Sequence, residues 1–383
     1  MICKRCGNSD PNYFYQGHRG TYCRKCVSFK RLLLEDELCD KEYDISYDSY
    51  KYSFEYPLTK YQKEVSDNCA LYIDDYDVLL KAVCGAGKTE IVVETISKYL
   101  KRGLKVCYAI ARREVVIDLY GRFKTIFNNA KVIALYGGHT SEEVGDLIIC
   151  TTHQLFRFYK TFDLLILDEV DAYPLSGNRE LMNIALNSTK GHIIFSTATT
   201  NSFLESFLSD RNYKELNLFV RPSLKPLIIP KVLYGPKLFL LIRMYLYLKN
   251  MSNQCIIFVS SKRICTLMHY LFNKLINCTY VYSDLNDRDN NISDFKNKKY
   301  QFIFATTVLE RGITIKDVNV IILVFNKNVF DKSSLVQMLG RVGRNFNNPT
   351  GDAYILSSVL DDEIKDAVDD LKKANEKYEM SIL

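Results

Sequence analysis

The sequence predicts an α/β protein with two parallel-sheet lobes in tandem, preceded by a small cysteine-rich domain. From Leu58 onward, short apolar runs alternate with segments of helical periodicity, which is the pattern of parallel sheets covered by helices. A proline-dense stretch from Arg221 to Pro236 interrupts this series, and a second alternating series follows it. We therefore expect three domains, at residues 1–56, 57–215 and 216–383.

Length and composition fit this organisation. Apolar residues make up 47% and charged residues 25% of the 383 residues, as in ordinary globular proteins with more than one core. The net charge of +6 only mildly favours an anionic partner. No apolar run approaches the length that crosses a bilayer, and the first residues do not resemble a signal peptide. These observations predict a soluble, cytoplasmic protein.

Four of the twelve cysteines have the spacing of metal ligands. Cys3 and Cys6 form one CxxC pair, and Cys23 and Cys26 form a second pair sixteen residues later. Each pair places two thiolates on one tight turn, and two such turns complete a tetrahedral Zn²⁺ site. His18 lies nearby, but the four cysteines already complete the set. Because little apolar material surrounds them, we expect this module to need its metal to fold.

The same segment is basic, with Lys4, Arg5, Arg24 and Lys25 beside the cysteines. Clustered cations attract phosphates, which slightly favours a zinc ribbon that contacts nucleic acid. A purely structural zinc module is the alternative, and the residues leave both interpretations open.

A glycine-rich loop joins the first apolar strand of the first lobe to a helix. The strand that begins at Asp77 runs into the loop, and a periodic helix follows from Ile91 to Leu100. In this context the loop amides bind phosphates, Lys88 reaches the terminal phosphate, and Thr89 ligates Mg²⁺. The loop therefore predicts nucleotide binding through Gly85, Ala86, Gly87, Lys88 and Thr89.

A carboxylate cluster ends another strand of the same lobe. The apolar run that begins at Phe162 stops at Asp168 and Glu169, and Asp171 follows two residues later. Such a cluster needs a cation, which at the carboxyl end of a parallel strand is usually a metal that carries phosphates. We expect Asp168 to hold Mg²⁺ through its water shell and Glu169 to orient and deprotonate the attacking water.

The run from Asp168 to Asp171 resembles the DExD box of superfamily 2 helicases, and other motifs of that family appear in order. Gln62 resembles the glutamine of a Q-motif, which pairs with adenine of ATP, although an ordinary helix-surface glutamine is the alternative. Segments after later strands resemble the motifs that grip one nucleic-acid strand by its backbone. These segments contain Arg112 and Arg113, Gly137 and Gly138, and Thr151, Thr152, His153 and Gln154.

The second series carries motifs that resemble the partner lobe of these helicases. Ser260 and Lys262 follow a strand, as in motif IV. Thr306 and Thr307 open a run that resembles motif V and continues through Arg311 and Gly312. The resemblance implies nucleic-acid contacts for these residues, except for Gly312, which it places at the nucleotide.

The run from Gln337 to Arg344 resembles motif VI. Arg341 and Arg344 have a spacing of three, so both can face one side of a helix. The resemblance implies that they act as arginine fingers at the γ-phosphate, with Gln337 beside them. A pair of surface arginines in salt bridges is the alternative.

A narrower resemblance is to the late competence proteins of the ComFA family. It is carried by Thr151–Asp163, Asp168–Pro174 and Val308–Thr314, together with four cysteines ahead of the helicase core. The resemblance implies two RecA-like lobes, a zinc ribbon, and ATP, Mg²⁺ and Zn²⁺ as cofactors. It implies an ATPase that helps draw single-stranded DNA through the competence channel, with the ComEC channel, ComFC and DprA as partners. It also allows peripheral association with the inner face of the cell membrane, and an oligomer.

Three functions share these motifs. The leading hypothesis is a Mg²⁺-dependent ATPase that single-stranded DNA stimulates and that translocates along it. A general RNA or DNA-repair helicase is the second, because motifs that grip the backbone do not report the sugar. An ATP-gated clamp or scaffold, which binds nucleic acid without moving along it, is the third.

Overall fold

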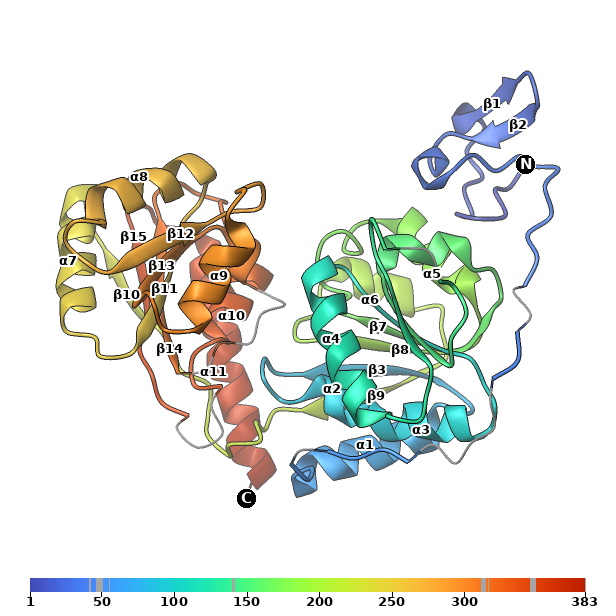
Figure 1. Cartoon of the computed structure of the whole chain (residues 1–383), viewed down its shortest axis with the longest axis horizontal. Coiled ribbons are helices and arrows are strands. Elements are labelled where there is room, and N and C mark those ends of the chain that lie inside the picture. The colour runs from blue at the N-terminus through green and yellow to red at the C-terminus, as the bar shows by residue number, and fades with distance from the viewer. Residues whose placement is uncertain are drawn as a thin grey trace. The chain divides into compact units, whose positions relative to one another are not determined.

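The computed structural model describes residues 1–40, 43–45, 51–54, 56–139, 142–310, 315, 317–344 and 349–382. The chain forms two compact units (Figure 1). The first comprises Met1–Ala82 and Gly87–Leu218, and the second comprises Val83–Ala86 and Phe219–Leu383.

The N-terminal part of the first unit is a small module with one antiparallel hairpin. Its elements are the 3-10 helix η1 (Pro11–Tyr13), strands β1 (Phe14–Gly17) and β2 (Gly20–Cys23), and the 3-10 helix η2 (Val27–Phe29). Within residues 1–40, the only buried apolar side chains are those of Cys3, Cys6, Cys23 and Cys26. The module therefore has no hydrophobic core of its own apart from its thiols, as predicted for a metal-dependent fold.

The rest of the first unit is built on a parallel sheet. Among the described residues, this sheet has seven strands in the order β5-β6-β4-β7-β8-β3-β9, and every pairing is parallel. The strands are β3 (Asp77–Ala82), β4 (Val106–Ile110), β5 (Val132–Leu135), β6 (Leu147–Thr151), β7 (Phe162–Asp168), β8 (Thr189–Thr197) and β9 (Tyr213–Leu218).

Helices cover both faces of this sheet. On one face, α5 and α6 pack against alternate strand residues such as Cys107, Leu165 and Leu167. On the other face, Phe123 of α4 contacts the ring of Tyr108, with the centroids 5.5 Å apart. The helices are α1 (Lys60–Tyr72), α2 (Lys88–Ile91), α3 (Val93–Lys101), α4 (Arg113–Ile126), η3 (Thr152–Arg157), α5 (Arg179–Ser188) and α6 (Ser202–Leu208). The helix predicted from Ile91 to Leu100 is thus interrupted at Val92, between α2 and α3.

The second unit repeats the architecture. Its sheet, as far as the structure describes it, has six parallel strands in the order β10-β15-β14-β11-β13-β12. The strands are β10 (Lys231–Tyr234), β11 (Gln254–Phe258), β12 (Cys278–Val281), β13 (Phe302–Ala305), β14 (Val318–Val324) and β15 (Ala353–Ser357). The helices are α7 (Lys237–Lys249), α8 (Lys262–Phe272), α9 (Arg288–Lys296), η4 (Thr307–Leu309), α10 (Lys332–Leu339) and α11 (Asp362–Ile382).

The central strands of both sheets are buried. Because strands that are buried on both faces contact only apolar surroundings, their residues are apolar throughout. Strands β11, β13 and β14 have 13 of their 16 residues among Ile, Val, Leu, Phe and Ala. The predicted α/β class, with two parallel-sheet lobes and a small N-terminal domain, is confirmed. No helix in the described parts of the chain is long and apolar enough to cross a membrane.

Candidate active site and metal centre

The glycine-rich loop lies where the sequence predicts it, between the end of β3 and the start of α2. Gly85 and Gly87 have φ angles of 80° and 86°, which favour glycine, and Gly87 is the N-cap of α2. A Cβ atom on Gly87 would lie 2.4 Å from Nε2 of Gln62, so no other residue fits there without movement. The Nζ atom of Lys88 lies 3.5 Å from the Ala82 carbonyl oxygen, above the loop.

Gln62 lies against the glycine-rich loop, as its resemblance to the Q-motif glutamine predicts. Thr59 and Gln62 form a capping box at the start of α1, in which each side chain bonds the other residue's backbone amide. The side chain of Gln62 is buried, and its amide nitrogen points at Gly87. The surface-glutamine alternative does not describe this position.

Asp168 stands at the carboxyl end of β7 with both carboxylate oxygens engaged. Ser196 Oγ donates to Oδ1 at 2.7 Å, and the backbone amide of Glu169 donates to the same atom at 2.9 Å. The hydroxyl of Tyr108 donates to Oδ2 at 2.7 Å. Strand register explains this, because Ser196 on β8 pairs directly with Asp168. These three donors hold the Asp168 side chain in one orientation.

Tyr108 is the residue that the sequence analysis missed. It lies in an apolar run on β4 and is almost fully buried. Burial, reinforced by the charge of Asp168, holds the pKa of Tyr108 well above its usual value, so the phenol keeps its proton and donates. The same hydroxyl interacts with Thr89. The one signal in the sequence is a tyrosine within an apolar strand, because the hydroxyl of a buried tyrosine needs a hydrogen-bond partner.

The carboxylates after Asp168 are held by the segment that follows β8. Thr199 Oγ1 donates to Oδ2 of Asp171 at 2.9 Å, so the run Ser196–Thr199 contacts both ends of the acidic turn. Glu169 adopts a positive φ of 56°, which turns its side chain out of the strand direction. The acidic turn is therefore fixed by backbone geometry and by two neighbouring hydroxyls.

These residues fit a nucleotide with Mg²⁺. Thr89 and Asp168, the predicted Mg²⁺ ligands, both interact with the hydroxyl of Tyr108, although Thr89 lies on α2 and Asp168 ends β7. A carboxylate has about four lone-pair sites, so Asp168 can still accept from metal-bound water. A hydroxyl and a carboxylate are oxygen ligands of the kind that Mg²⁺ prefers.

The four N-terminal cysteines form a cluster that fits Zn²⁺. Their sulfur atoms all lie within 4.8 Å of one another. The Sγ atoms of Cys3 and Cys26 are 3.6 Å apart, and those of Cys6 and Cys23 are 3.8 Å apart. Four thiolates bound about 2.3 Å from a tetrahedral zinc ion stand about 3.8 Å from one another. The cluster is thus compatible with zinc in spacing, burial and donor chemistry.

The predicted nucleic-acid residues of the first lobe form two groups. Arg113 begins α4, directly after Arg112, and its guanidinium lies 5.1 Å from the ring centre of Tyr136. Gly137 and Gly138 form an exposed turn just beyond that tyrosine, and apart from their chain neighbours no atom of the described residues lies within 4 Å of where their Cβ atoms would be. This turn leaves room for a polymer backbone to approach closely.

The second group is the end of β6 and the turn η3. Thr151 and Thr152 are buried, so their side chains are not on the surface. His153 is exposed, and Gln154 is half-buried, with its side-chain oxygen accepting from Arg157 at 2.6 Å. The exposed chemistry of this segment is therefore that of His153 and Gln154.

In the second lobe, the predicted contacts lie at the ends of neighbouring strands β11 and β13. Ser260 and Lys262 follow β11, and Lys262 forms an ion pair with Asp284. Thr306 is the N-cap of η4, and Thr307 is exposed. Arg311 and Gly312 lie outside the described residues.

Arg341 and Arg344 do not share a helix face, which corrects the sequence prediction. Helix α10 ends at Leu339, and Gly340 is its C-cap. Arg341 is 2% exposed, and its Nε donates to the Glu310 carbonyl at 3.2 Å. Arg344 is half-buried, and its Nε donates to the Gly340 carbonyl at 2.8 Å. Gln337 is buried on α10. The glycine ends the helix before the arginines, so their spacing of three has no helical meaning.

Arg221 organises this turn and was not singled out from the sequence. It is 3% exposed, and it donates to the carbonyls of Gly340 at 3.0 Å and Val342 at 2.8 Å. Burial lowers the pKa of Arg221 to about 10, which leaves it charged at neutral pH. A planar guanidinium suits two carbonyls that lie side by side.

Comparison with known proteins agrees with this geometry. Residues 59–207 match the DEAD/DEAH box helicases, and residues 236–346 match the helicase conserved C-terminal domain. Competence protein ComFA of Streptococcus pneumoniae is 32% identical over 98% of this chain and 91% of its own length. Competence protein ComFA of Bacillus subtilis is 30% identical over 98% of this chain and 85% of its own length. The chain belongs to the ComFA family.

Solved structures share the fold of this ComFA-family chain. Dbp5 of S. cerevisiae, bound to RNA and ADP BeF3, aligns with a TM-score of 0.62 and 16% identity, over 82% of this chain and 87% of that chain. RecG bound to a three-way DNA junction aligns with a TM-score of 0.59 and 19% identity, over 84% of this chain and 45% of that chain. The helicase matches identify the chain as an ATP-dependent hydrolase of the helicase type, and the solved structures share its fold of two RecA-like lobes.

Proposed function

We propose that this protein is a Mg²⁺-dependent ATPase that single-stranded DNA stimulates, and that it translocates along the strand to help import transforming DNA during competence. The observation that carries the ATPase half is the Asp168 carboxylate, which three donors hold at the end of β7 in the lobe that carries the glycine-rich loop. The competence half rests on the two relatives named as competence proteins. The resemblance extends the proposal to ComEC, ComFC and DprA as partners.

In the proposed reaction, each residue of the first lobe has one task. The amides around Gly87 bind phosphate oxygens, and Lys88 binds the terminal phosphate. Bound Mg²⁺ supplies charge neutralisation, and Thr89 and Asp168 hold it in place. Glu169 orients the attacking water and accepts its proton. The donors on Asp168 keep that carboxylate in one orientation, because Ser196 and Tyr108 fix both of its oxygens.

We propose the second lobe as the source of transition-state charge. Arg341 and Arg344 lie on a turn that is fastened to the carbonyls of its own lobe. An arginine finger needs such support, because a loosely held guanidinium would lose its geometry at the moment of reaction. Hydrolysis would then require the two lobes to close, and the release of products would let them open again. This cycle of closing and opening would move a bound nucleic-acid strand.

We propose that single-stranded DNA runs across the loops that follow the carboxyl ends of the parallel β-strands. On the first lobe this path includes Arg113, the turn at Gly137 and Gly138, and His153 with Gln154. On the second lobe it includes Ser260, Lys262 and Thr307. Most of these groups bind phosphate or sugar without reading a base.

The test is ATP turnover in the presence of different polymers. We expect single-stranded DNA to raise turnover well above the level seen with duplex DNA or RNA, and we expect Lys88→Ala to serve as an inactive blank that still binds DNA. Stimulation by RNA alone would favour the general helicase instead. Turnover that no polymer changes would refute the proposal.

We also propose that the protein contacts an anionic membrane surface through α7 and α8 of the second lobe. Their inner faces pack on the sheet through residues such as Met244 and Met268, while their outer faces are apolar as well. Exposed side chains recur along these outer faces at Leu238, Phe239, Ile242 and Leu246 on α7, and at Leu267, Tyr270 and Leu271 on α8. An exposed apolar patch of this kind marks an interaction site.

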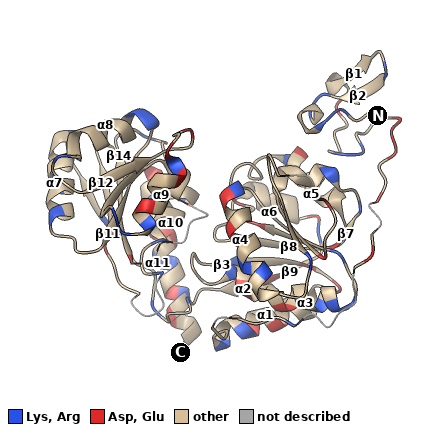
Figure 2. Cartoon of the chain, viewed as in Figure 1, with Lys and Arg blue, Asp and Glu red and all other residues tan. Residues whose placement is uncertain are grey.

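Charge around these helices favours lipid over a neutral partner. Between Leu216 and Ser283 the chain has nine Lys or Arg residues and no Asp or Glu. Figure 2 shows blue and no red on α7 and α8. Basic residues around an apolar helix face suit an anionic interface.

A further inference from the structure

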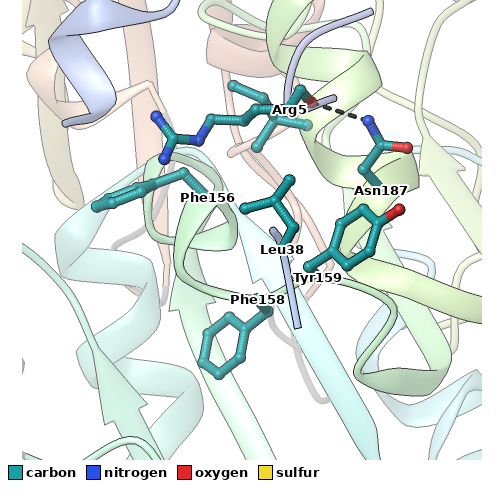
Figure 3. Close-up of a pocket in the computed structure, with 7 residues that line it drawn as sticks. Arg5, Leu38, Phe156, Phe158, Tyr159 and Asn187 are labelled. Atoms are coloured by element: carbon teal, nitrogen blue, oxygen red, sulfur yellow. Dashed lines mark hydrogen bonds between the residues drawn. The ribbon is translucent and has the colours of Figure 1, made fainter. Parts of the chain in front are cut away.

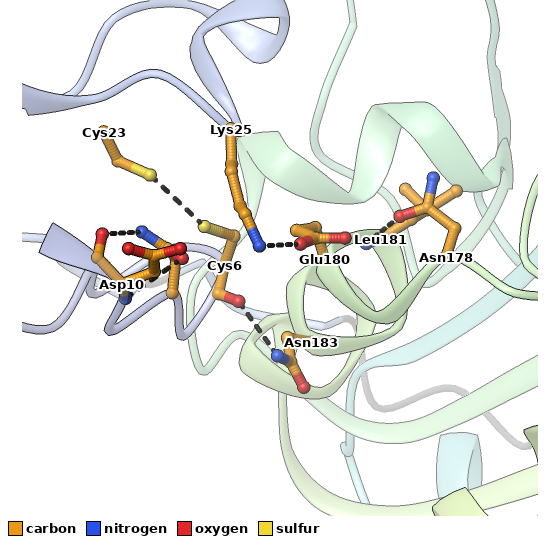
Figure 4. A network of polar contacts seen from close by, with 9 residues as sticks. Cys6, Asp10, Cys23, Lys25, Asn178, Glu180, Leu181 and Asn183 are labelled. Carbon is orange, nitrogen blue, oxygen red and sulfur yellow. Dashed lines mark hydrogen bonds and ion pairs between the residues drawn. The ribbon is translucent and has the colours of Figure 1, made fainter. Parts of the chain in front are cut away.

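The N-terminal zinc module is fastened to helix α5 of the first lobe. Asn183 Nδ2 donates to the Cys6 carbonyl at 2.9 Å, and Lys25 forms an ion pair with Glu180 at 2.8 Å (Figure 4). Asn187 Nδ2 donates to the Arg5 carbonyl at 2.8 Å. Two of these bonds end on backbone carbonyl oxygens of the first CxxC turn. The docking therefore depends on the backbone conformation of that turn as well as on the charge of Lys25.

Arg5, inside the same turn, connects the module to η3. It is 7% exposed, and its Nη1 donates to the carbonyls of Phe29 and Lys30. Its guanidinium lies 5.7 Å from the ring centre of Phe156, which belongs to η3. Arg5 and Phe156 line a small cavity at this junction together with Leu38 and Asn187 (Figure 3).

Phe29 then reaches the residue that is proposed to touch nucleic acid. Its ring stacks on His153 with the centroids 5.8 Å apart and the planes at 27°, and it lies 6.0 Å from the ring of Phe156. His153 thus has one ring face against the zinc module, while much of the residue stays exposed. Partial burial lowers the pKa of His153, which favours the neutral, stacking form of the imidazole.

The position of Phe29 is tied to the second CxxC pair. Phe29 ends η2, which begins directly after Cys26, and its amide donates to the Cys26 carbonyl at 3.1 Å. Because the thiols are the only buried apolar side chains of residues 1–40, we expect the bound metal to be needed to keep the module folded, with Arg5 and Phe29 in place. Loss of the metal would release both side chains from η3.

We propose that the zinc module is a positioning element for the nucleic-acid surface of the first lobe, in which Arg5 and Phe29 hold η3 and His153 in the conformation that binds a single strand. This inference rests on the proposed function for its ligand. Zinc occupancy would set the affinity for single-stranded DNA, while hydrolysis without DNA, which depends on the loop at Lys88 and on Asp168, would stay unchanged. Arg5 and Phe29 act through η3 and need not touch the strand.

The experiment compares full-length variants on the same short helix. Phe29→Ala removes the contact with His153, Phe29→Tyr keeps it, and Val27→Ala is the matched control, because Val27 is on η2 and 40% exposed. We would measure zinc content, the Kd for a fluorescent oligo-dT by anisotropy, ATP turnover against oligo-dT concentration, and deuterium exchange of residues 152–157.

We expect Phe29→Ala to keep its zinc and to raise both the Kd and the half-stimulating oligo-dT concentration at least about fivefold. Turnover without DNA should stay at the wild-type level, and exchange in 152–157 should accelerate. Phe29→Tyr and Val27→Ala should match the wild type. Removal of zinc from the wild type by a chelator should reproduce the Phe29→Ala result. An unchanged Kd and unchanged exchange would overturn the inference.

A second variant guards against loss of the module itself. Asn183→Ala removes a docking contact on the lobe and leaves the sequence of the module unchanged. It should produce the same rise in Kd with zinc retained. If Phe29→Ala lost its zinc and Asn183→Ala behaved like the wild type, the inference would be wrong. If the wild type bound no oligo-dT, the proposed function would fail, and the exchange of 152–157 after zinc removal would then decide the coupling alone.

Discussion

At the scale of single residues, the chemistry depends on how Asp168 is held. A carboxylate at the end of a buried strand can rotate unless its oxygens are fixed, and here Ser196 and Tyr108 each fix one. The tyrosine hydroxyl also interacts with Thr89 on the phosphate loop. One phenol thereby links the two motifs that we propose to bind a nucleotide with its metal.

Tyr108→Phe tests this link. The change leaves one buried carboxylate oxygen without its donor, so we expect the free energy of unfolding to fall by about 1–3 kcal/mol. We also expect more Mg²⁺ to be needed for half-maximal turnover. Tyr99→Phe is a matched control, because its buried hydroxyl donates to the Ile73 carbonyl, remote from the carboxylate. The control should lose stability in urea denaturation but keep the wild-type Mg²⁺ dependence, and an identical dependence in both variants would refute the role of Tyr108.

Arg344→Ala tests the proposed finger. A contact that matters mainly in the transition state lowers kcat while leaving ATP binding largely intact. We expect kcat to fall by roughly a thousandfold, as for other arginine fingers. Arg263→Ala, an exposed position on α8, is the control and should be active. Equal losses in kcat and in ATP affinity, measured by steady-state kinetics and nucleotide titration, would argue against a finger.

The sequence predicted where the glycine-rich loop and the acidic turn lie in the fold, and the residues that it missed share a cause. The loop at Lys88 and the acidic turn at Asp168 are contiguous motifs, so their spacing alone carries the chemistry. Tyr108 and Arg221 act through partners that are distant in sequence, and each looks like an ordinary core or linker residue until the strands are paired. Thr152 was predicted as a contact, yet the fold buries its side chain.

At the scale of elements, the turn after α10, and not the helix itself, determines where Arg341 and Arg344 lie. Sequence spacing predicted that Arg341 and Arg344 would share a helix face, but Gly340 ends the helix first. The conformation of this turn is set by Arg221, which binds two of its carbonyls. Spacing rules for helices apply only as far as the helix extends.

Arg221→Lys tests this support. A lysine keeps the charge but cannot donate to two carbonyls in one plane. We expect the free energy of unfolding to fall by about 1–3 kcal/mol and ATP turnover to fall with it, because the turn that carries Arg341 and Arg344 loosens. Wild-type turnover together with wild-type stability in urea would show that the turn does not depend on Arg221.

The N-terminal cysteine module shows the same limit. Two CxxC pairs predicted the metal ligands, and the four thiols do cluster. The docking of the module on α5 and η3 was not predictable, because it depends on single side chains such as Asn183 and Phe29 that match surfaces far away in the sequence.

At the scale of the whole molecule, the fold followed from the alternation of strands and helices and from the proline-dense break between two series. The outer faces of α7 and α8 did not follow from it. Helices that are apolar on both sides look like core helices in sequence, and only the structure separates the side packed on the sheet from the side left exposed.

The proposed membrane contact is testable with vesicles. We expect the protein to sediment with vesicles that contain anionic lipid, and to sediment less with purely zwitterionic vesicles. Ile242→Glu places a charge in the middle of the exposed stripe and should release the protein while ATP turnover stays normal. Tyr173→Glu, another exposed apolar residue on the other lobe, is the control and should sediment like the wild type. Equal sedimentation with both lipid mixtures would contradict the proposal.

The central claim is that ATP hydrolysis moves this protein along single-stranded DNA. Displacement of streptavidin from a biotin at one end of an oligonucleotide tests it most directly. We predict that the wild type displaces streptavidin with ATP from one end only, that a non-hydrolysable ATP analogue supports no displacement, and that Lys88→Ala is inactive. ATP turnover stimulated by DNA without displacement from either end would contradict the claim and favour the ATP-gated clamp.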